Sequence, residues 1–131
     1  MAKNINGNMK ITKKDNLKAI AYLSDDGSIY DADKRESRQL KFIKQYAKAH
    51  GIMIVKIIRK NAMGPVIMNK HIKSIIESIK KGEANAIIVT EIAKVSHNSI
   101  DSYTKVGLIN EAGGTVISVM EGILKLPIRR R

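Results

Sequence analysis

The chain has 131 residues, 44% of them hydrophobic, which is enough for one domain with a single core. It contains no cysteine, which excludes disulfides and thiolate metal sites and is typical of a reducing cytoplasm, and no apolar stretch approaches the roughly 18 to 20 residues that span a bilayer. Lys and Arg number 24 against 12 Asp and Glu, a formal charge of +12, so we expect a polyanionic partner, nucleic acid first, and no membrane partner.

Positive charge is concentrated between residues 56 and 81, where Glu77 is the single acid. We interpret this segment as a phosphate-contacting surface, and the competing interpretation is a solvated lysine-rich face. With one Phe, four Tyr and no Trp, the chain lacks the aromatic residues of a base-stacking platform for single strands. The basic residues of the segment are Lys56, Arg59, Lys60, Lys70, Lys73, Lys80 and Lys81.

The first half of the chain predicts an arm, a strand and a helix. Residues 1–16 are polar and have no period, so we expect a flexible basic arm. Residues 17–23 are apolar and stop at the turn-forming run Ser24-Asp25-Asp26-Gly27-Ser28, which predicts a first strand. Residues 36–50 repeat apolar side chains at helical spacing, and Gly51 follows as a C-terminal stop.

The second half continues the alternation. Residues 52–58 predict a second strand, broken by residues 61–65. Ile72, Ile75, Ile76 and Ile79 recur at i, i+3, i+4 and i+7, which predicts an amphipathic helix. Residues 86–89 predict a third strand, residues 100–113 a third helix and residues 115–120 a fourth strand.

This order predicts one α/β domain over residues 17–124. We expect a mostly parallel sheet of four to five strands with helices on both faces, in three layers. Residues 125–131 should form a basic C-terminal tail.

The most informative segment is residues 84–98, where an apolar run passes into a polar turn. It resembles the segment of serine recombinases, the resolvase and invertase family, in which a strand ends in Asp-Arg-Leu-Ser-Arg. Here that motif reads Ala93-Lys94-Val95-Ser96-His97. The resemblance extends over about residues 18–123.

Three further places carry the resemblance. Tyr22 is similar to the Tyr of a first strand that ends in Tyr-x-Arg-x-Ser, and Gln39 to a Gln in the following helix. Residues 116–122, Val-Ile-Ser-Val-Met-Glu-Gly, resemble a fourth strand closed by Glu-Gly. The resemblance therefore implies a resolvase-like catalytic domain.

In that family a serine oxygen attacks a DNA phosphate while arginines stabilise the transition state. Counting from Tyr22, the first-strand arginine falls on Ser24 and the nucleophilic serine on Asp26, whose carboxylate would repel phosphate. The helix-opening arginine falls on Asn69, and only Lys94 keeps a fixed positive charge, without the guanidinium fork. We therefore expect a pseudoenzyme with the vestigial positions Ser24, Asp26, Gln39, Asn69, Ala93, Lys94 and His97.

The expected function is that of a basic module that binds DNA or an active recombinase without cleaving strands. DNA binding should be weak and nonspecific, through the phosphate backbone, and a homodimer is compatible with the sequence. We expect no metal and no cofactor, and a cytoplasmic location. Recombinases continue from the fourth strand into a long dimerising helix and a DNA-binding domain, which residues 123–131 do not supply, so we expect no autonomous strand exchange. The expected phosphate-binding residues are Lys94, His97, Lys70, Lys73, Arg59, Lys60, Arg129, Arg130 and Arg131.

Two alternatives remain open. With a shifted register, Ser24 or Ser28 could be the nucleophile of an active recombinase, although loop serines usually form turns or cap helices. Residues 19–29 also resemble the Asp-x-Asp-Gly-Thr motif of Mg²⁺-dependent dehalogenase-type phosphatases, with Asp26 as acid/base. In that alignment the nucleophilic aspartate falls on Ser24, and Glu91 and Asp101 stand alone instead of forming a metal-binding pair.

Overall fold

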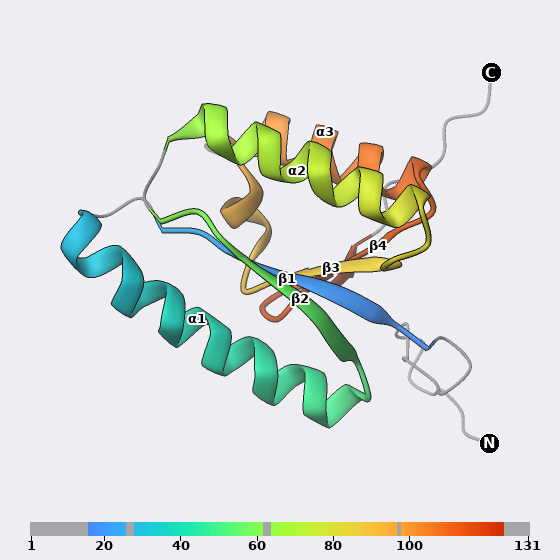
Figure 1. Cartoon of the computed structure of the whole chain (residues 1–131), viewed down its shortest axis with the longest axis horizontal. Helices are drawn as coiled ribbons and strands as arrows, with labels where there is room; N and C mark the ends of the chain where they lie inside the picture. The colour runs from blue at the N-terminus through green and yellow to red at the C-terminus, as the bar shows by residue number, and fades with distance from the viewer. Residues whose placement is uncertain (1–15, 26–27, 62–63, 97, 125–131) are drawn as a thin grey trace.

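The computed structural model describes residues 16–25, 28–61, 64–96 and 98–124. A five-stranded sheet in the order β2-β1-β3-β4-β5 lies between one helix on one face and two helices on the other (Figure 1). The first four strands are parallel, and β5 runs antiparallel to β4. The predicted mostly parallel sheet with helices on both faces is therefore confirmed.

The two central strands are the most hydrophobic segments of the chain. β1 (Lys18–Leu23) and β3 (Ala86–Val89) are buried along almost their whole length, as expected for parallel strands covered on both faces. β2 (Met53–Arg59) is an edge strand and is only partly covered. β4 (Thr115–Ser118) pairs with β3 and with the short β5 (Gly122–Leu124), which forms the other edge.

Helix α1 (Ile29–His50) begins seven residues before the predicted helix. Its N-cap is Ser28, whose side chain accepts a hydrogen bond from the Asp31 amide. The early turns, residues 29–35, were missed because Ala32 is the one buried side chain described in them, so no apolar period marks them. The helix ends as predicted at Gly51, which adopts a left-handed conformation with φ of 70°.

The opposite face carries α2 (Pro65–Lys80) and α3 (Ser99–Glu111), preceded by the short 3₁₀ helix η2 (Ile92–Val95). The two helices pack closely near Gly114. A Cβ atom there would lie 2.7 Å from Ile79 Cδ1 and 2.9 Å from Ile109 Cγ2, so a larger residue would force these two side chains to move. The sequence predicted both helices but not η2, which is too short to show a period.

The sheet separates two buried layers. On the α1 side, Ile43 and Ala47 pack against strand residues such as Ile88. On the other side the predicted stripe of α2, including Ile72 and Ile75, packs against the sheet. Complete burial of one such side chain contributes about 1.5 to 3 kcal/mol, so these layers provide most of the stability that positions the loops.

The predicted arm over residues 1–16 and the predicted tail over residues 125–131 lie outside the described residues, apart from Asn16. No helix in the described part of the chain combines the length and the apolar character needed to cross a membrane.

Candidate functional site

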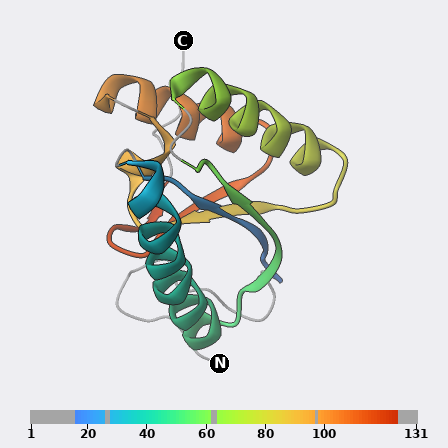
Figure 2. The same cartoon turned by 60° about the vertical axis from the view of Figure 1, so that its left-hand side comes forward.

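The candidate site lies at the carboxyl ends of the parallel strands. The beginnings of α1, α2 and α3 and the η2 turn gather at this end of the sheet, as Figures 1 and 2 show. Parallel strands bring the loops that follow them to one edge, which is where α/β domains usually place ligands. The loops after β1, β2 and β3 therefore supply the residues described below.

The loop after β1 is fixed by Gln39 of α1. The Gln39 Nε2 group donates a hydrogen bond to the Ser24 carbonyl at 2.6 Å, and the Ser24 amide donates one to Gln39 Oε1 at 3.0 Å. Ser24 and Gln39 are both buried. The position at which the resemblance implies an arginine is thus occupied by a buried serine held at both main-chain groups.

Ser28 has a structural role at the beginning of α1. Its hydroxyl accepts the Asp31 amide at 3.3 Å and donates to the Asp31 carboxylate at 3.2 Å. Asp25, next to Ser24, forms an ion pair with Arg35 at 3.2 Å. The Ser28 contacts are those of a helix cap, the role that loop serines usually have. Asp26 lies outside the described residues.

Glu36, which the sequence did not single out, holds the loop after β2. It is fully buried, and its Oε2 atom accepts the Asn61 amide at 2.9 Å. Burial raises the pKa of the Glu36 carboxyl, although the Asn61 hydrogen bond and the charge of Arg59 oppose the shift. No hydrogen-bond partner of Oε1 lies among the described residues. A polar residue at an inward helical position is the sequence signal that could have identified it.

The basic residues that follow β2 differ from their prediction. Lys60 is 1% exposed, so its expected role as a DNA phosphate contact is corrected: the side chain lies inside the domain, near the Glu36 carboxylate. Arg59 is half-buried and lies 3.5 Å from Asp33 and 3.4 Å from the Ser37 hydroxyl. The charges of Arg59 and Lys60 both favour the ionised form of the Glu36 carboxyl and so oppose the effect of its burial.

After β3, the η2 turn carries Ala93 and Lys94. Ala93 is exposed and Lys94 is half-buried. The end of the turn is held by Lys105 of α3, whose Nζ atom donates to the Val95 carbonyl at 2.9 Å and lies 3.0 Å from Asp101 Oδ2. His97 lies outside the described residues.

Glu121 holds the beginning of the same turn. The Ile92 amide donates to Glu121 Oε1 at 2.9 Å, and the Ser118 hydroxyl donates to the same oxygen. The Glu-Gly pair that closes the fourth strand in the resemblance therefore connects β4 to η2. Sequence reasoning found Glu121 as a motif position but not as the residue that positions the Lys94 turn.

A buried pair links β1 to α2 behind the loops. The Tyr22 hydroxyl lies 3.1 Å from His71 Nδ1, and the rings meet edge to face. Burial, with the nearby Glu36 charge, raises the pKa of Tyr22, and burial lowers the pKa of His71. The pair is therefore neutral near pH 7. Tyr22, predicted from the resemblance, is a core residue that connects two elements of the site.

The structure joins only part of the predicted set. Ser24 and Gln39 are in direct contact, and Lys94 lies on the turn after β3 at the same end of the sheet. Asn69, Lys70 and Lys73 are exposed on α2. The predicted cations Arg129, Arg130 and Arg131 lie outside the described residues. Within those residues there is also no group of three or more His, Cys, Asp or Glu side chains that could hold a metal ion.

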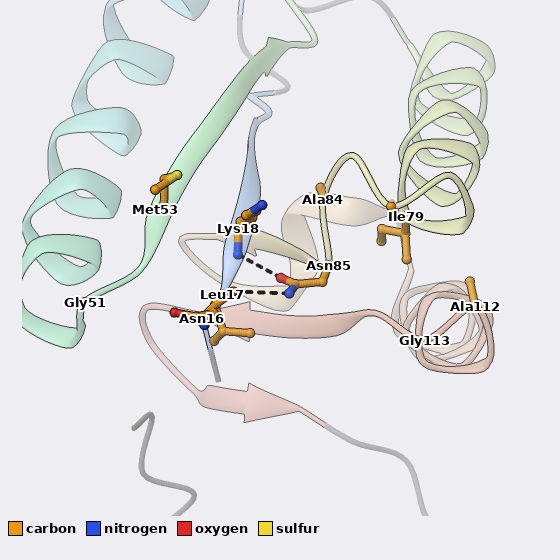
Figure 3. Close-up of a pocket in the computed structure, with 11 residues that line it drawn as sticks. Asn16, Leu17, Lys18, Gly51, Met53, Ile79, Ala84, Asn85, Ala112 and Gly113 are labelled. Carbon is orange, nitrogen blue, oxygen red and sulfur yellow. Dashed lines mark hydrogen bonds between the residues drawn. The ribbon is translucent and has the colours of Figure 1, made fainter. Parts of the chain in front are cut away.

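A pocket of about 500 Å³ lies at the other end of the sheet, at the amino ends of the strands (Figure 3). Asn85 lies on its wall, accepting the Lys18 amide at 2.7 Å and donating to the Asn16 carbonyl at 3.2 Å. Lys18 is the one ionisable residue of its lining within the described residues. A single lysine among the described lining residues provides no acid–base pair, and the pocket is separate from the candidate site.

Three solved structures have a similar fold. The C-terminal catalytic domain of ISC1926 TnpA, an IS607-like serine recombinase, is 16% identical with a TM-score of 0.63, over 79% of this chain and 67% of that chain. A resolvase family site-specific recombinase from Streptococcus pneumoniae is 19% identical with a TM-score of 0.67, over 81% and 74%. The N-terminal catalytic domain of TP901-1 integrase is 15% identical with a TM-score of 0.68, over 80% and 79%.

No protein-family model and no curated protein sequence matches this chain. At these identities the structural comparisons show the fold, which is that of serine-recombinase catalytic domains. The resolvase-like fold that the sequence resemblance implied is therefore confirmed.

Proposed function

We propose that this chain is a resolvase-like domain that binds DNA through its phosphates and does not cut the strands. The observation that carries the proposal is the Ser24–Gln39 contact. At a position where the resemblance implies a phosphate-gripping arginine, the chain has a buried serine whose main chain is tied to α1. No cation can reach a phosphate from that position.

The other substitutions act in the same direction. Asn69 and Lys94 stand where the resemblance implies arginines, and neither offers two parallel donors on a charged plane. Loss of one preorganised donor to a transition state costs about 2 to 4 kcal/mol. These losses are not additive, but two or three of them are enough to suppress phosphoryl transfer by several orders of magnitude.

Binding needs less than catalysis, because it requires positive charge at the surface and not an oriented transition state. Lys94 at the η2 turn and Lys70 and Lys73 on α2 supply such charge, within a chain of net charge +12. Lysine contacts to phosphate carry no sequence information. The proposed binding is therefore electrostatic and independent of sequence.

A salt titration of duplex binding tests this function. Fluorescence anisotropy with two unrelated 20-base-pair duplexes should give similar affinities, with log K falling linearly as log salt rises. Lys94→Ala should weaken both duplexes equally, by about twofold to tenfold. Absence of binding at low salt would overturn the DNA proposal and favour a protein partner.

An active recombinase as protein partner is the second candidate. Ile100, Tyr103 and Leu108 on α3 expose apolar surface, which is the kind of feature that protein interfaces use. A homodimer would use the same feature. Sedimentation of the chain, alone and with a serine recombinase, distinguishes these cases by mass.

A further inference from the structure

The longest helix carries basic residues on the side that faces away from the sheet. Lys34, Arg38, Lys41 and Lys48 of α1 are all exposed. At about 100° per residue, they fall within about 80° of arc, at a spacing of four, three and seven residues. We call these four residues the basic stripe.

The stripe lies opposite the buried side of the helix. Ala32, Ile43 and Ala47 face the sheet, about half a turn around the helix from the stripe. Among the described helices, α1 is the one on its face of the sheet, and Figure 1 shows its outer side uncovered by any of the others. The four side chains therefore project from the molecule on the face opposite α2 and α3.

No acid neutralises the stripe along most of its length. Residues 37–76 contain no Asp or Glu. The acids at the beginning of α1 have other contacts, since Asp31 bonds to Ser28 and Asp33 pairs with Arg59. No member of the stripe has an ion-pair partner within the described part of the chain. A row of unpaired cations on a rigid support matches a polyanion with regularly spaced charges.

We infer that the basic stripe of α1 is a second DNA-binding surface, which takes the phosphate backbone of duplex DNA. From Lys34 to Lys48 the helix rises about 21 Å, the length of about six base pairs at 3.4 Å each. Duplex is favoured over single strands because Tyr30, the exposed aromatic residue on the same arc of α1, could stack a single base but provides no platform for a run of bases. This inference rests on the proposed function for its ligand, DNA, but it holds whether or not the chain cleaves the strands.

The test compares two variants with the same net charge. In the stripe variant, Lys34→Gln, Arg38→Gln, Lys41→Gln and Lys48→Gln are combined. In the control, four lysines near the beginning of the chain are changed to Gln, at Lys3, Lys10, Lys13 and Lys14, which removes the same charge. Glutamine has nearly the helix propensity of lysine, and circular dichroism confirms that each variant is folded. A third variant with Lys34→Arg, Lys41→Arg and Lys48→Arg keeps the charge and should keep the affinity.

The expected result is a loss of duplex affinity of about tenfold or more for the stripe variant, with the slope of log K against log salt reduced by about 3. The control should lose less than about threefold. Equal losses in the two variants, or preferential binding of single strands, would overturn the stripe and leave the proposed function intact. If the unmodified chain binds no DNA at low salt, both proposals fail. If the chain cleaves DNA and the stripe variant still loses duplex affinity, only the proposed function is overturned.

Discussion

Gln39 holds Ser24 by both of its main-chain groups, with its amide nitrogen on the Ser24 carbonyl and its amide oxygen on the Ser24 N–H. Both residues are buried, so water cannot replace either bond. This contact fixes the chain where β1 passes into the loop of the candidate site.

Removing the Gln39 amide should destabilise the domain. Gln39→Ala leaves a buried carbonyl and a buried N–H of Ser24 without partners, at a cost of about 2 to 4 kcal/mol in the free energy of unfolding. Urea unfolding followed by circular dichroism measures this value. Gln45→Ala, at an exposed position of the same helix, is the matched control and should change stability by less than about 0.5 kcal/mol. Similar values for the two variants would mean that the Ser24 contact does not stabilise the loop.

Glu36 should make the stability depend on pH. Because its pKa is raised in the folded protein, the folded state binds this proton more tightly than the unfolded chain does. The contribution of Glu36 is therefore fully present below its unfolded pKa and is lost as the pH rises through the folded pKa. Melting temperatures from pH 4 upward should show this decline, and Glu36→Gln should remove it.

The matched control for Glu36 is Glu77→Gln, at an exposed position of α2. It should retain the pH dependence of the unmodified protein. Curves for Glu36→Gln and the unmodified chain that stay parallel across the whole range would show that Glu36 does not bind its proton more tightly on folding.

Glu121 should control the order of the η2 turn. Glu121→Ala removes the acceptor of the Ile92 amide, so hydrogen exchange at Ile92 should become faster, with a loss of stability of about 1 to 2 kcal/mol. Glu121→Gln keeps one oxygen acceptor, so its Ile92 exchange rate should fall between those of Glu121→Ala and the unmodified chain. Glu111→Ala, exposed at the end of α3, should leave Ile92 exchange unchanged. Unchanged exchange in Glu121→Ala would place the support of η2 elsewhere.

Much of the fold could be predicted from the sequence because the hydrophobic residues of its helices and strands recur at regular spacings. The α2 isoleucines and the apolar run of β3 predict a helix and a buried strand directly. The first two turns of α1 could not be predicted, since Ala32 is the one buried side chain described in them and the next inward positions hold the polar Glu36 and Gln39. Their pairing with Asn61 and Ser24 is a tertiary contact, and one sequence does not reveal it.

The candidate site could be predicted only in outline. The family resemblance predicted that Ser24, Gln39 and Lys94 lie at the carboxyl end of the sheet, because the positions of the loops follow from the order of the strands. It assigned Lys60 to the surface from its charge alone, whereas the burial of Lys60 beside Glu36 depends on folding. Exposure of a charged residue in a short loop is set by neighbours that are distant in sequence.

We propose, above all, that this resolvase-like domain does not cut DNA. The most direct measurement incubates the full chain with nicked suicide duplexes and looks for a covalent protein–DNA adduct after denaturing electrophoresis, with an active serine recombinase on its own nicked site as positive control. We predict no adduct at a protein concentration that saturates binding. An adduct that disappears in Ser24→Ala or Ser28→Ala would contradict the claim and identify the nucleophile.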